Sequence, residues 1–187
     1  MPHFVGGKRI DPDTGDAVEV DNLENLINRG LVFQSLSQIN LGAGLARWML
    51  IQVDAAARLT IASWSFWADG DAQGEMYTGS TPDAPVGGAP LALDTDYFNK
   101  NRNFGNDIAS TIIDQPSLAG TWGPGTLCDI EPVDVANQAQ FRSADIRAGQ
   151  NKWVLAPSGN YAVRLLNNDG GNPTNVVLKM LFYELPA

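Results

Sequence analysis

Tyr161-Ala162-Val163-Arg164-Leu165-Leu166 and Val176-Val177-Leu178-Lys179-Met180-Leu181-Phe182-Tyr183 are two largely apolar runs with the length of β-strands. Residues 167–173 between them are almost all turn formers, so the sequence predicts a hairpin. A strand that covers a core on one face and meets water on the other alternates apolar and polar residues. Here both faces are apolar, so we expect the second face to be covered too, most simply by a second subunit.

The composition agrees with a protein that forms interfaces. The chain has 187 residues, of which 44% are hydrophobic and 18% are charged. This length suits one domain with an arm, and it is long enough to bury a core without disulfides. The charged share lies below the roughly 25% that is usual in soluble domains, which indicates that part of the surface is an interface.

Upstream of the hairpin, short apolar runs with period two alternate with turn residues. We expect strands at 31–39, 45–53, 59–67, 76–78, 91–93, 108–113, 126–131, 139–143 and 152–155. The fold class is therefore all-β. The long polar section 68–106 is awkward in an up-and-down barrel but natural where strands cross between two sheets. We predict a jelly-roll-like β-sandwich over residues 31–187.

Residues 1–30 are predicted to form an extended N-terminal arm carrying a short helix. Residues 1–20 are mostly polar, and Asp21 with Glu24 resembles a capping box at the start of a helix. Gly30 provides the stop. A helix of about two turns is unstable alone, so we expect it to dock on another surface. The candidate partner-binding residues of the arm are Phe4, Leu23, Leu26 and Ile27.

Charge and hydropathy argue against two classes of partner. The formal net charge is −9, and nucleic-acid binding needs clustered Lys and Arg, so we expect no nucleic-acid partner. No run approaches the roughly 18 apolar residues of a membrane span, so no membrane partner is expected. Residues 1–8 contain no apolar signal-peptide core, which predicts synthesis in the cytoplasm without a cleaved signal.

We find no catalytic constellation and expect no enzyme activity, no cofactor and no metal. The single histidine, His3, lies in the arm, so a Ser-His-Asp or Cys-His site has little to build on. The aspartates within 11–16, 69–71 and 94–96 resemble calcium loops loosely, but Asp16 and Asn22 stand where an EF-type loop needs Gly and Glu. We interpret them as turn aspartates. Glu75, Glu131 and Glu184 are not placed as a glycosidase pair by the sequence.

We interpret the cysteine and two of the tryptophans as structural residues, and one tryptophan as a candidate contact residue. Cys128 is the only cysteine, and we interpret it as a small buried hydrophobe. Trp48 and Trp153 lie inside apolar strands and are predicted to be core residues. Trp122 lies in the loop Gly120-Thr121-Trp122-Gly123-Pro124-Gly125, so it is the best candidate for contact with a protein or glycan partner.

A set of short motifs occurs in a fixed order along residues 31–187. The motifs are Asn101-Arg102-Asn103, Gly120-Thr121, Leu155-Ala156-Pro157-Ser158-Gly159-Asn160-Tyr161, Asn167-Asn168 and Phe182-Tyr183-Glu184. In this order they resemble the head decoration (cement) proteins of tailed bacteriophages, which are small virion proteins with a jelly-roll domain. The resemblance implies a homotrimer that binds the major capsid protein where capsomers meet, and it implies no catalytic residues.

The expected function is therefore that of a phage capsid decoration protein on the virion surface, which stabilises the head. Two alternatives remain open: a tail, baseplate or fibre protein acting as an adhesin, and a carbohydrate-binding β-sandwich module. The hairpin supplies the candidate subunit-interface residues, which are Arg164, Lys179, Leu181 and Tyr183.

Overall fold

A computed structural model describes most of the β-sandwich and parts of the arm. The described residues are 4–5, 8–10, 17–19, 22–81, 89–92, 96–101, 103, 105–114, 123, 125–133, 142–145 and 153–187. Among them, the side chains of 4–24, 89, 131–133 and 142–145 are not described. The elements of the sandwich are β4 (Val32–Leu41), β5 (Ala46–Gln52), β6 (Ala57–Ala68), β7 (Ala72–Thr78), β8 (Ala89–Pro90), β9 (Tyr97–Asn99), β10 (Thr111–Asp114), β11 (Thr126–Val133), β12 (Arg142–Asp145), β13 (Trp153–Leu155), β14 (Asn160–Asn167) and β15 (Thr174–Pro186).

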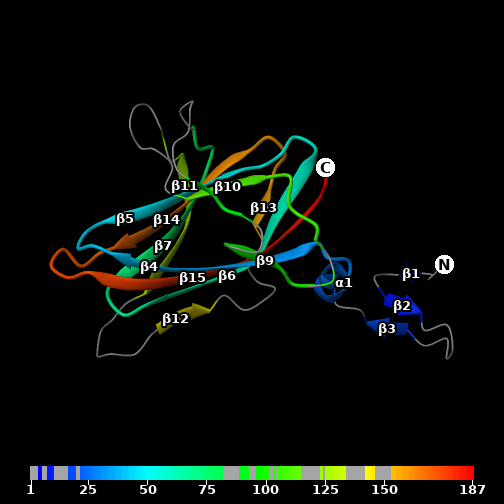
Figure 1. Cartoon of the computed structure of the whole chain (residues 1–187), viewed down its shortest axis with the longest axis horizontal. Coiled ribbons are helices and arrows are strands. Elements are labelled where there is room, and N and C mark those ends of the chain that lie inside the picture. The colour runs from blue at the N-terminus through cyan, green and yellow to red at the C-terminus, as the bar shows by residue number, and fades with distance from the viewer. Residues whose placement is uncertain are drawn as a thin grey trace.

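The strands form two antiparallel sheets that pack as a sandwich (Figure 1). Sheet I has the order β11-β7-β14-β5-β10-β8, and sheet II has the order β12-β6-β15-β4-β9, with β13 also paired to β6. From β4 to β7 each strand lies in the sheet opposite its predecessor, and β14 and β15 insert between earlier strands. This is the double Greek-key order of a jelly roll, so the predicted fold is confirmed.

The strand pair that led to this prediction is not a hairpin in the hydrogen-bonding sense. β14 pairs with β5 and β7 in sheet I, whereas β15 pairs with β4 and β6 in sheet II. The 167–173 connection therefore crosses between the sheets, and the predicted hairpin is wrong in this respect. Each strand has neighbours on both sides, which explains part of its apolar character because central strands are the most covered.

The core lies between the sheets and is filled from alternate residues of each strand. On β15, Val176, Leu178, Met180 and Phe182 are buried, while the residues between them are half-buried. Phe182 stacks on Phe33 at a ring-centroid distance of 5.8 Å. This two-residue periodicity places Val177, Lys179 and Leu181 on the outward face of sheet II.

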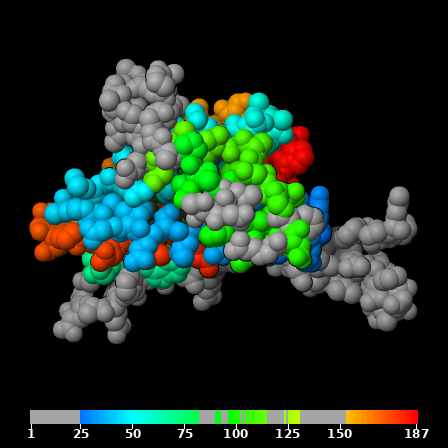
Figure 2. Space-filling model, viewed as in Figure 1, coloured from blue at the N-terminus to red at the C-terminus, as the bar shows by residue number. Residues whose placement is uncertain are grey.

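The connection between β7 and β11 widens both sheets. β8 and β10 extend sheet I beyond β5, and β9 extends sheet II beyond β4. In Figure 2 the described part of this insert, in green, lies beside the blue residues of β4. The Glu184 carboxylate accepts hydrogen bonds from the backbone N–H groups of Ala109 and Ser110, at 2.5 and 3.0 Å, and so ties the insert to β15.

The arm contains more structure than its polar composition indicated. β1 (Phe4–Val5), β2 (Lys8–Ile10) and β3 (Ala17–Glu19) form a small antiparallel sheet, followed by α1 (Asn22–Asn28). Gly30 has φ 69°, and Leu31 N–H donates to the Leu26 carbonyl at 3.0 Å, which is the Schellman end that the sequence predicted. The Asn99 side chain donates to the Gly30 carbonyl at 2.8 Å, so the end of α1 docks on the insert of its own chain.

Candidate functional site

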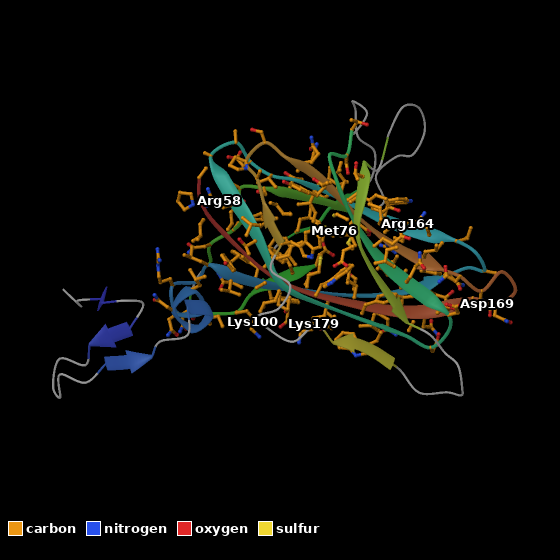
Figure 3. The ribbon with its side chains drawn as sticks, turned by 180° about the vertical axis from the view of Figure 1, so that it is seen from behind. Arg58, Met76, Lys100, Arg164, Asp169 and Lys179 are labelled. Carbon is orange, nitrogen blue, oxygen red and sulfur yellow. The ribbon has the colours of Figure 1, made fainter. Side chains whose placement is uncertain are left out.

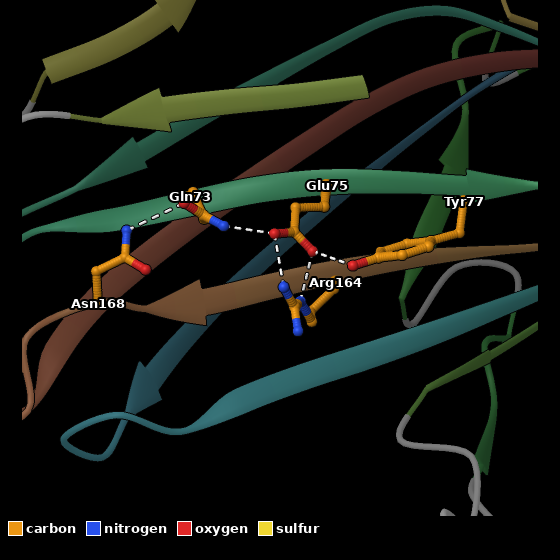
Figure 4. Close-up of polar contacts among 5 residues, drawn as sticks. All are labelled: Gln73, Glu75, Tyr77, Arg164 and Asn168. Atoms are coloured by element: carbon orange, nitrogen blue, oxygen red, sulfur yellow. Dashed lines mark hydrogen bonds and ion pairs between the residues drawn. The ribbon is translucent and has the colours of Figure 1, made fainter. Parts of the chain in front are cut away.

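The outward face of sheet I carries a cluster of polar and aromatic side chains from three neighbouring strands, and Figure 4 shows its members from β7 and β14. We call it the arginine cluster; its members are Gln73, Glu75 and Tyr77 of β7, Arg164 of β14, and Trp48 of β5. Alternation along β7 places its three members on one face, and the register sets Arg164 opposite both Glu75 and Trp48.

Glu75 is the centre of the arginine cluster. Its side chain is only 2% exposed, and Arg164 binds it at two points, with Nε–Oε2 and Nη2–Oε1 distances of 2.5 and 2.6 Å. The Tyr77 hydroxyl donates to Oε2 at 2.5 Å, and the Gln73 amide donates to Oε1. The carboxylate thus accepts four hydrogen bonds, which is the condition under which a buried charge is tolerated.

The aromatic rings of Trp48 and Tyr77 lie beside the guanidinium group of Arg164. Its Cζ atom lies 5.3 Å from the Trp48 ring centroid and 5.9 Å from that of Tyr77, within the range of cation–π attraction. The two rings are 5.3 Å apart and tilted by 49°. The prediction that Trp48 is a core residue is therefore wrong, because its position in β5 faces outward. Trp153, by contrast, packs against the core as predicted.

These contacts fix the protonation states in the arginine cluster. Burial raises the pKa of Glu75, but the hydrogen bonds and charge of Arg164, with those of Tyr77 and Gln73, outweigh it, so the pKa lies below the ordinary value. Burial and the neighbouring Glu75 raise the pKa of Tyr77 to about 12. Glu75 is therefore an ionised, fully engaged carboxylate rather than a free acid or base.

The arginine cluster has the composition of a binding surface. Leu127 and Ile130 of the edge strand β11 lie opposite Tyr77 and Glu75 in register, and their side chains are 41% and 46% exposed. Tryptophan, tyrosine and arginine are the residues that most often dominate binding energy at protein interfaces. The partly exposed Arg164, held by the half-buried Trp48 and the buried Tyr77, lies near these exposed aliphatic side chains, and together they can contact a protein or glycan partner.

The outward face of sheet II has a different character. By register, Lys179 lies between Leu36 of β4 and Ser65 of β6, and Leu36 is 57% exposed. Among the described residues, Lys179 has no ion-pair partner. Figure 3 shows Lys179 and Lys100 along sheet II, whereas Arg164 lies on the other sheet.

The predicted subunit-interface residues therefore fall on two faces. Arg164 lies on sheet I and is paired within its own chain, while Lys179, Leu181 and Tyr183 lie on the outward face of sheet II. Of the predicted partner-binding residues, Leu26 and Ile27 are half-buried in α1. The Phe4 and Leu23 side chains and the whole of Trp122 lie outside the described residues.

The sequence interpretation did not find the arginine cluster. The available signal was the alternation of Gln73, Glu75 and Tyr77, which places a carboxylate between two hydrogen-bond donors on one strand face. Only the register with β14 identifies Arg164 as its partner, and the register is set by contacts far apart in the sequence.

The aspartates that resembled calcium loops have structural partners where they are described. Asp69 accepts from the backbone N–H and the side chain of Asn175, at 2.7 and 2.6 Å, and Asp96 accepts from the Ala92 N–H at 2.9 Å. Across the described residues, no group of three or more His, Cys, Asp or Glu could hold a metal ion. Asp94 and the aspartates within 11–16 lie outside the described residues.

Cys128 differs from its predicted role. It is the extra residue of a β-bulge where β11 pairs with β7, and it is exposed rather than buried. Its thiol donates to the Met76 carbonyl, with an Sγ–O distance of 3.1 Å. The prediction of a buried cysteine is wrong because a bulge shifts the alternation of the strand.

The motifs that carry the phage resemblance shape turns in this structure. The Tyr161 hydroxyl accepts from the Ala156 N–H at 2.8 Å, and Ser158 in the same turn has φ 56°. The buried Asn167 side chain donates to the carbonyls of Gly42 and Asn172, at 3.1 and 2.8 Å. These residues therefore secure the connections between strands.

No protein-family model matches the chain, and no curated protein is similar to it. Within the described residues, no helix is long and apolar enough to span a membrane.

Proposed function

We propose that the protein is a decoration protein of a tailed-bacteriophage head, which binds the outer shell between capsomers and stabilises it. The observation that carries this proposal is a jelly-roll sandwich with an arm that lies beyond α1, at the end opposite the 167–173 connection (Figure 1). Proteins with this fold have many different functions. The motifs of residues 101–184 are therefore the reason for proposing this role rather than another.

The physical demands of the role agree with this architecture. Packaged DNA exerts pressure on the capsid shell. A protein that bridges neighbouring shell subunits stabilises the shell, because its contacts must be lost before those subunits separate. Many symmetric copies bind by avidity, without high affinity at each site. The protein acts as a homotrimer on the major capsid protein, and the arm reaches a neighbouring subunit, with the entropy of ordering offset by new contacts.

The test is to locate the protein on purified phage particles by immunogold labelling or a particle map. Label over the head supports the proposal. Deletion of residues 1–30 is expected to reduce attachment to capsids while the sandwich remains folded. Normal decoration by the truncated protein would contradict the role of the arm. Label over the tail instead supports the alternative of a tail, baseplate or fibre protein.

A glycan-binding module is the second candidate, and Trp48 is the observation that favours it. Its ring lies on an outward sheet face beside the Arg164 guanidinium, an arrangement that suits stacking on a sugar with polar groups at the rim. Tryptophan fluorescence with ligands from a glycan array tests this candidate. Trp48→Ala and Trp122→Ala separate the two possible contact residues, and absence of any glycan ligand would contradict it.

A further inference from the structure

The cations of the described sandwich are distributed unevenly. Within residues 31–187, the described cationic side chains are Arg47, Arg58, Lys100, Arg164 and Lys179. Arg164 pairs with Glu75, and Arg47 pairs with Asp114 at the end of β5. The other three have no described carboxylate partner. Because the chain has a net charge of −9, carboxylates are abundant, and three cations without a described carboxylate partner require an explanation.

All three cations without a described carboxylate partner lie on the outward face of sheet II. Lys179 is the register partner of Leu36 and Ser65, and Arg58 is opposite Leu185 further along β15. Lys100 follows β9, and its Nζ atom donates to the Gln34 side chain at 3.2 Å. We call the middle of this face the lysine face; its described members are Gln34, Leu36, Gln38, Ser63, Ser65, Trp67, Lys100, Val177, Lys179 and Leu181.

The lysine face contains no described acidic side chain. Asp69 lies at its margin, where both carboxylate oxygens already accept from Asn175. Asp145 of β12 is opposite Ser65 in register, so one strand separates its backbone from Lys179. The Asp145 side chain is outside the described ones. The described side chains of the face are thus apolar, polar or cationic, with exposed Leu36 beside the central lysine.

We infer that the lysine face docks against a second copy of this chain, through a different and acidic surface of that copy. Charge complementarity selects this occupant because the chain is strongly acidic outside the lysine face. A twofold contact would place the lysine face against itself, with two cations, Lys100 and Lys179, and one occupied marginal carboxylate on each side. The contact is therefore heterologous. Repetition of a heterologous contact closes a ring when the rotation between neighbouring subunits closes and builds an open filament when it does not, and the homotrimer of the proposed function requires the closed form.

This inference rests on the self-association in the proposed function and specifies its surface. Three of the four interface residues predicted from sequence, Lys179, Leu181 and Tyr183, lie on the outward face of sheet II. The fourth, Arg164, belongs to the opposite sheet. In a ring each subunit contributes two different surfaces to its neighbours, so residues on both sheets can be covered.

The experiment measures the molar mass of the full chain by size-exclusion chromatography with light scattering. The variants are Lys179→Glu and Lys100→Glu, singly and together. Arg58→Glu is the matched control, because it makes the same charge change on sheet II outside the lysine face. The far-UV circular dichroism spectrum of each variant, which should match that of the wild type, shows that the sandwich is folded.

We expect the wild-type chain to form an assembly larger than a dimer, and the double variant to associate about tenfold or more weakly. Arg58→Glu should associate like the wild type. A monomeric wild type, or a twofold dimer, overturns the inference and the homotrimer together. A wild-type assembly that the double variant leaves intact overturns the lysine face alone. Localisation on phage particles is measured separately, so failure of the head location leaves this result standing.

Discussion

Arg164 on β14 and Glu75 on β7 form a two-point ion pair on the outward face of sheet I, with N–O distances of 2.5 and 2.6 Å. The two partners are unequal, because Glu75 is 2% exposed and Arg164 is 27% exposed. The arginine can rehydrate if the pair is broken, whereas the carboxylate cannot without local opening. The consequence of a substitution therefore depends on which partner is removed.

Removal of Arg164 should destabilise the protein strongly, because it leaves a buried carboxylate without its counter-charge. We expect Arg164→Ala to lower the free energy of unfolding by about 2–3 kcal/mol, less than for a fully buried pair since Arg164 is partly exposed. Urea denaturation followed by tryptophan fluorescence measures the change. Arg58→Ala is the control, with an expected effect within about 0.5 kcal/mol. Equal effects of the two substitutions would contradict this account.

The same ion pair predicts a specific pH dependence. The pKa of Glu75 lies below its ordinary value in the folded protein, so the unfolded state binds its proton first as the pH falls. Its contribution to stability is present above the unfolded pKa of about 4.3. That contribution is lost as the pH falls from there through the folded pKa. Glu75→Gln should therefore be less stable than the wild type at neutral pH and show a flatter profile in acid. Parallel profiles from pH titration of urea midpoints would rule out this role for Glu75.

The fold could be predicted from the sequence, because the two-residue periodicity of the strands and the turn residues between them are local signals. The apolar runs 161–166 and 176–183 correspond to β14 and β15, and Gly30 ends α1 as predicted. The arrangement of β14 and β15 in different sheets was not predictable, since a turn-rich connection is compatible with both a hairpin and a crossover. The long polar section also concealed β9, whose three residues are too few for a periodic pattern.

The candidate site was harder to predict because it depends on register and on a bulge. Trp48 has the same apolar sequence context as a core residue, and only its position relative to Met49 decides that it faces outward. Cys128 was misplaced because the bulge in β11 shifts the alternation. The sequence identified Lys179 and Arg164 as isolated cations in apolar strands. It did not reveal that Arg164 forms an ion pair with Glu75, whereas Lys179 has no ion-pair partner among the described residues.

Asn167 and Asn168 are adjacent but should differ greatly in their importance for stability. The Asn167 side chain is buried, with 1% of the residue exposed. Its Nδ2 atom donates hydrogen bonds to the carbonyls of Gly42 and Asn172, and its Oδ1 atom accepts one from the Asp169 N–H at 2.9 Å. The amide also donates to the buried Leu41 carbonyl at 3.3 Å. Asn167→Ala removes all of these hydrogen bonds at a buried position and should cost about 2–4 kcal/mol. The Asn168 side chain makes exposed hydrogen bonds, so Asn168→Ala should cost less than about 1 kcal/mol. Similar losses in urea denaturation would contradict this distinction.

Gly125 at the start of β11 is required for backbone reasons. Its φ is 93°, and a Cβ atom there would lie 2.2 Å from the Thr78 carbonyl oxygen. We expect Gly125→Ala to destabilise the protein by about 2 kcal/mol or more, because strain and a clash with backbone act together. Gly105→Ala is the control, since a Cβ atom there meets nothing within 4 Å. Thermal unfolding of both variants tests the prediction, and a stable Gly125→Ala variant would disprove it.

Cys128 is exposed, yet it should react slowly with thiol reagents. Partial burial raises the pKa of its thiol, and the negative charge of Asp129 raises it further. The thiolate is the reactive form, so its fraction near neutral pH is smaller than in a free cysteine. The rate of reaction with a disulfide reagent, measured against pH, should have a midpoint above that of free cysteine. Asp129→Asn should move the midpoint down, because it removes one of the two causes, and the remaining shift then measures the contribution of burial. An unchanged midpoint in Asp129→Asn would show that the carboxylate does not act on the thiol.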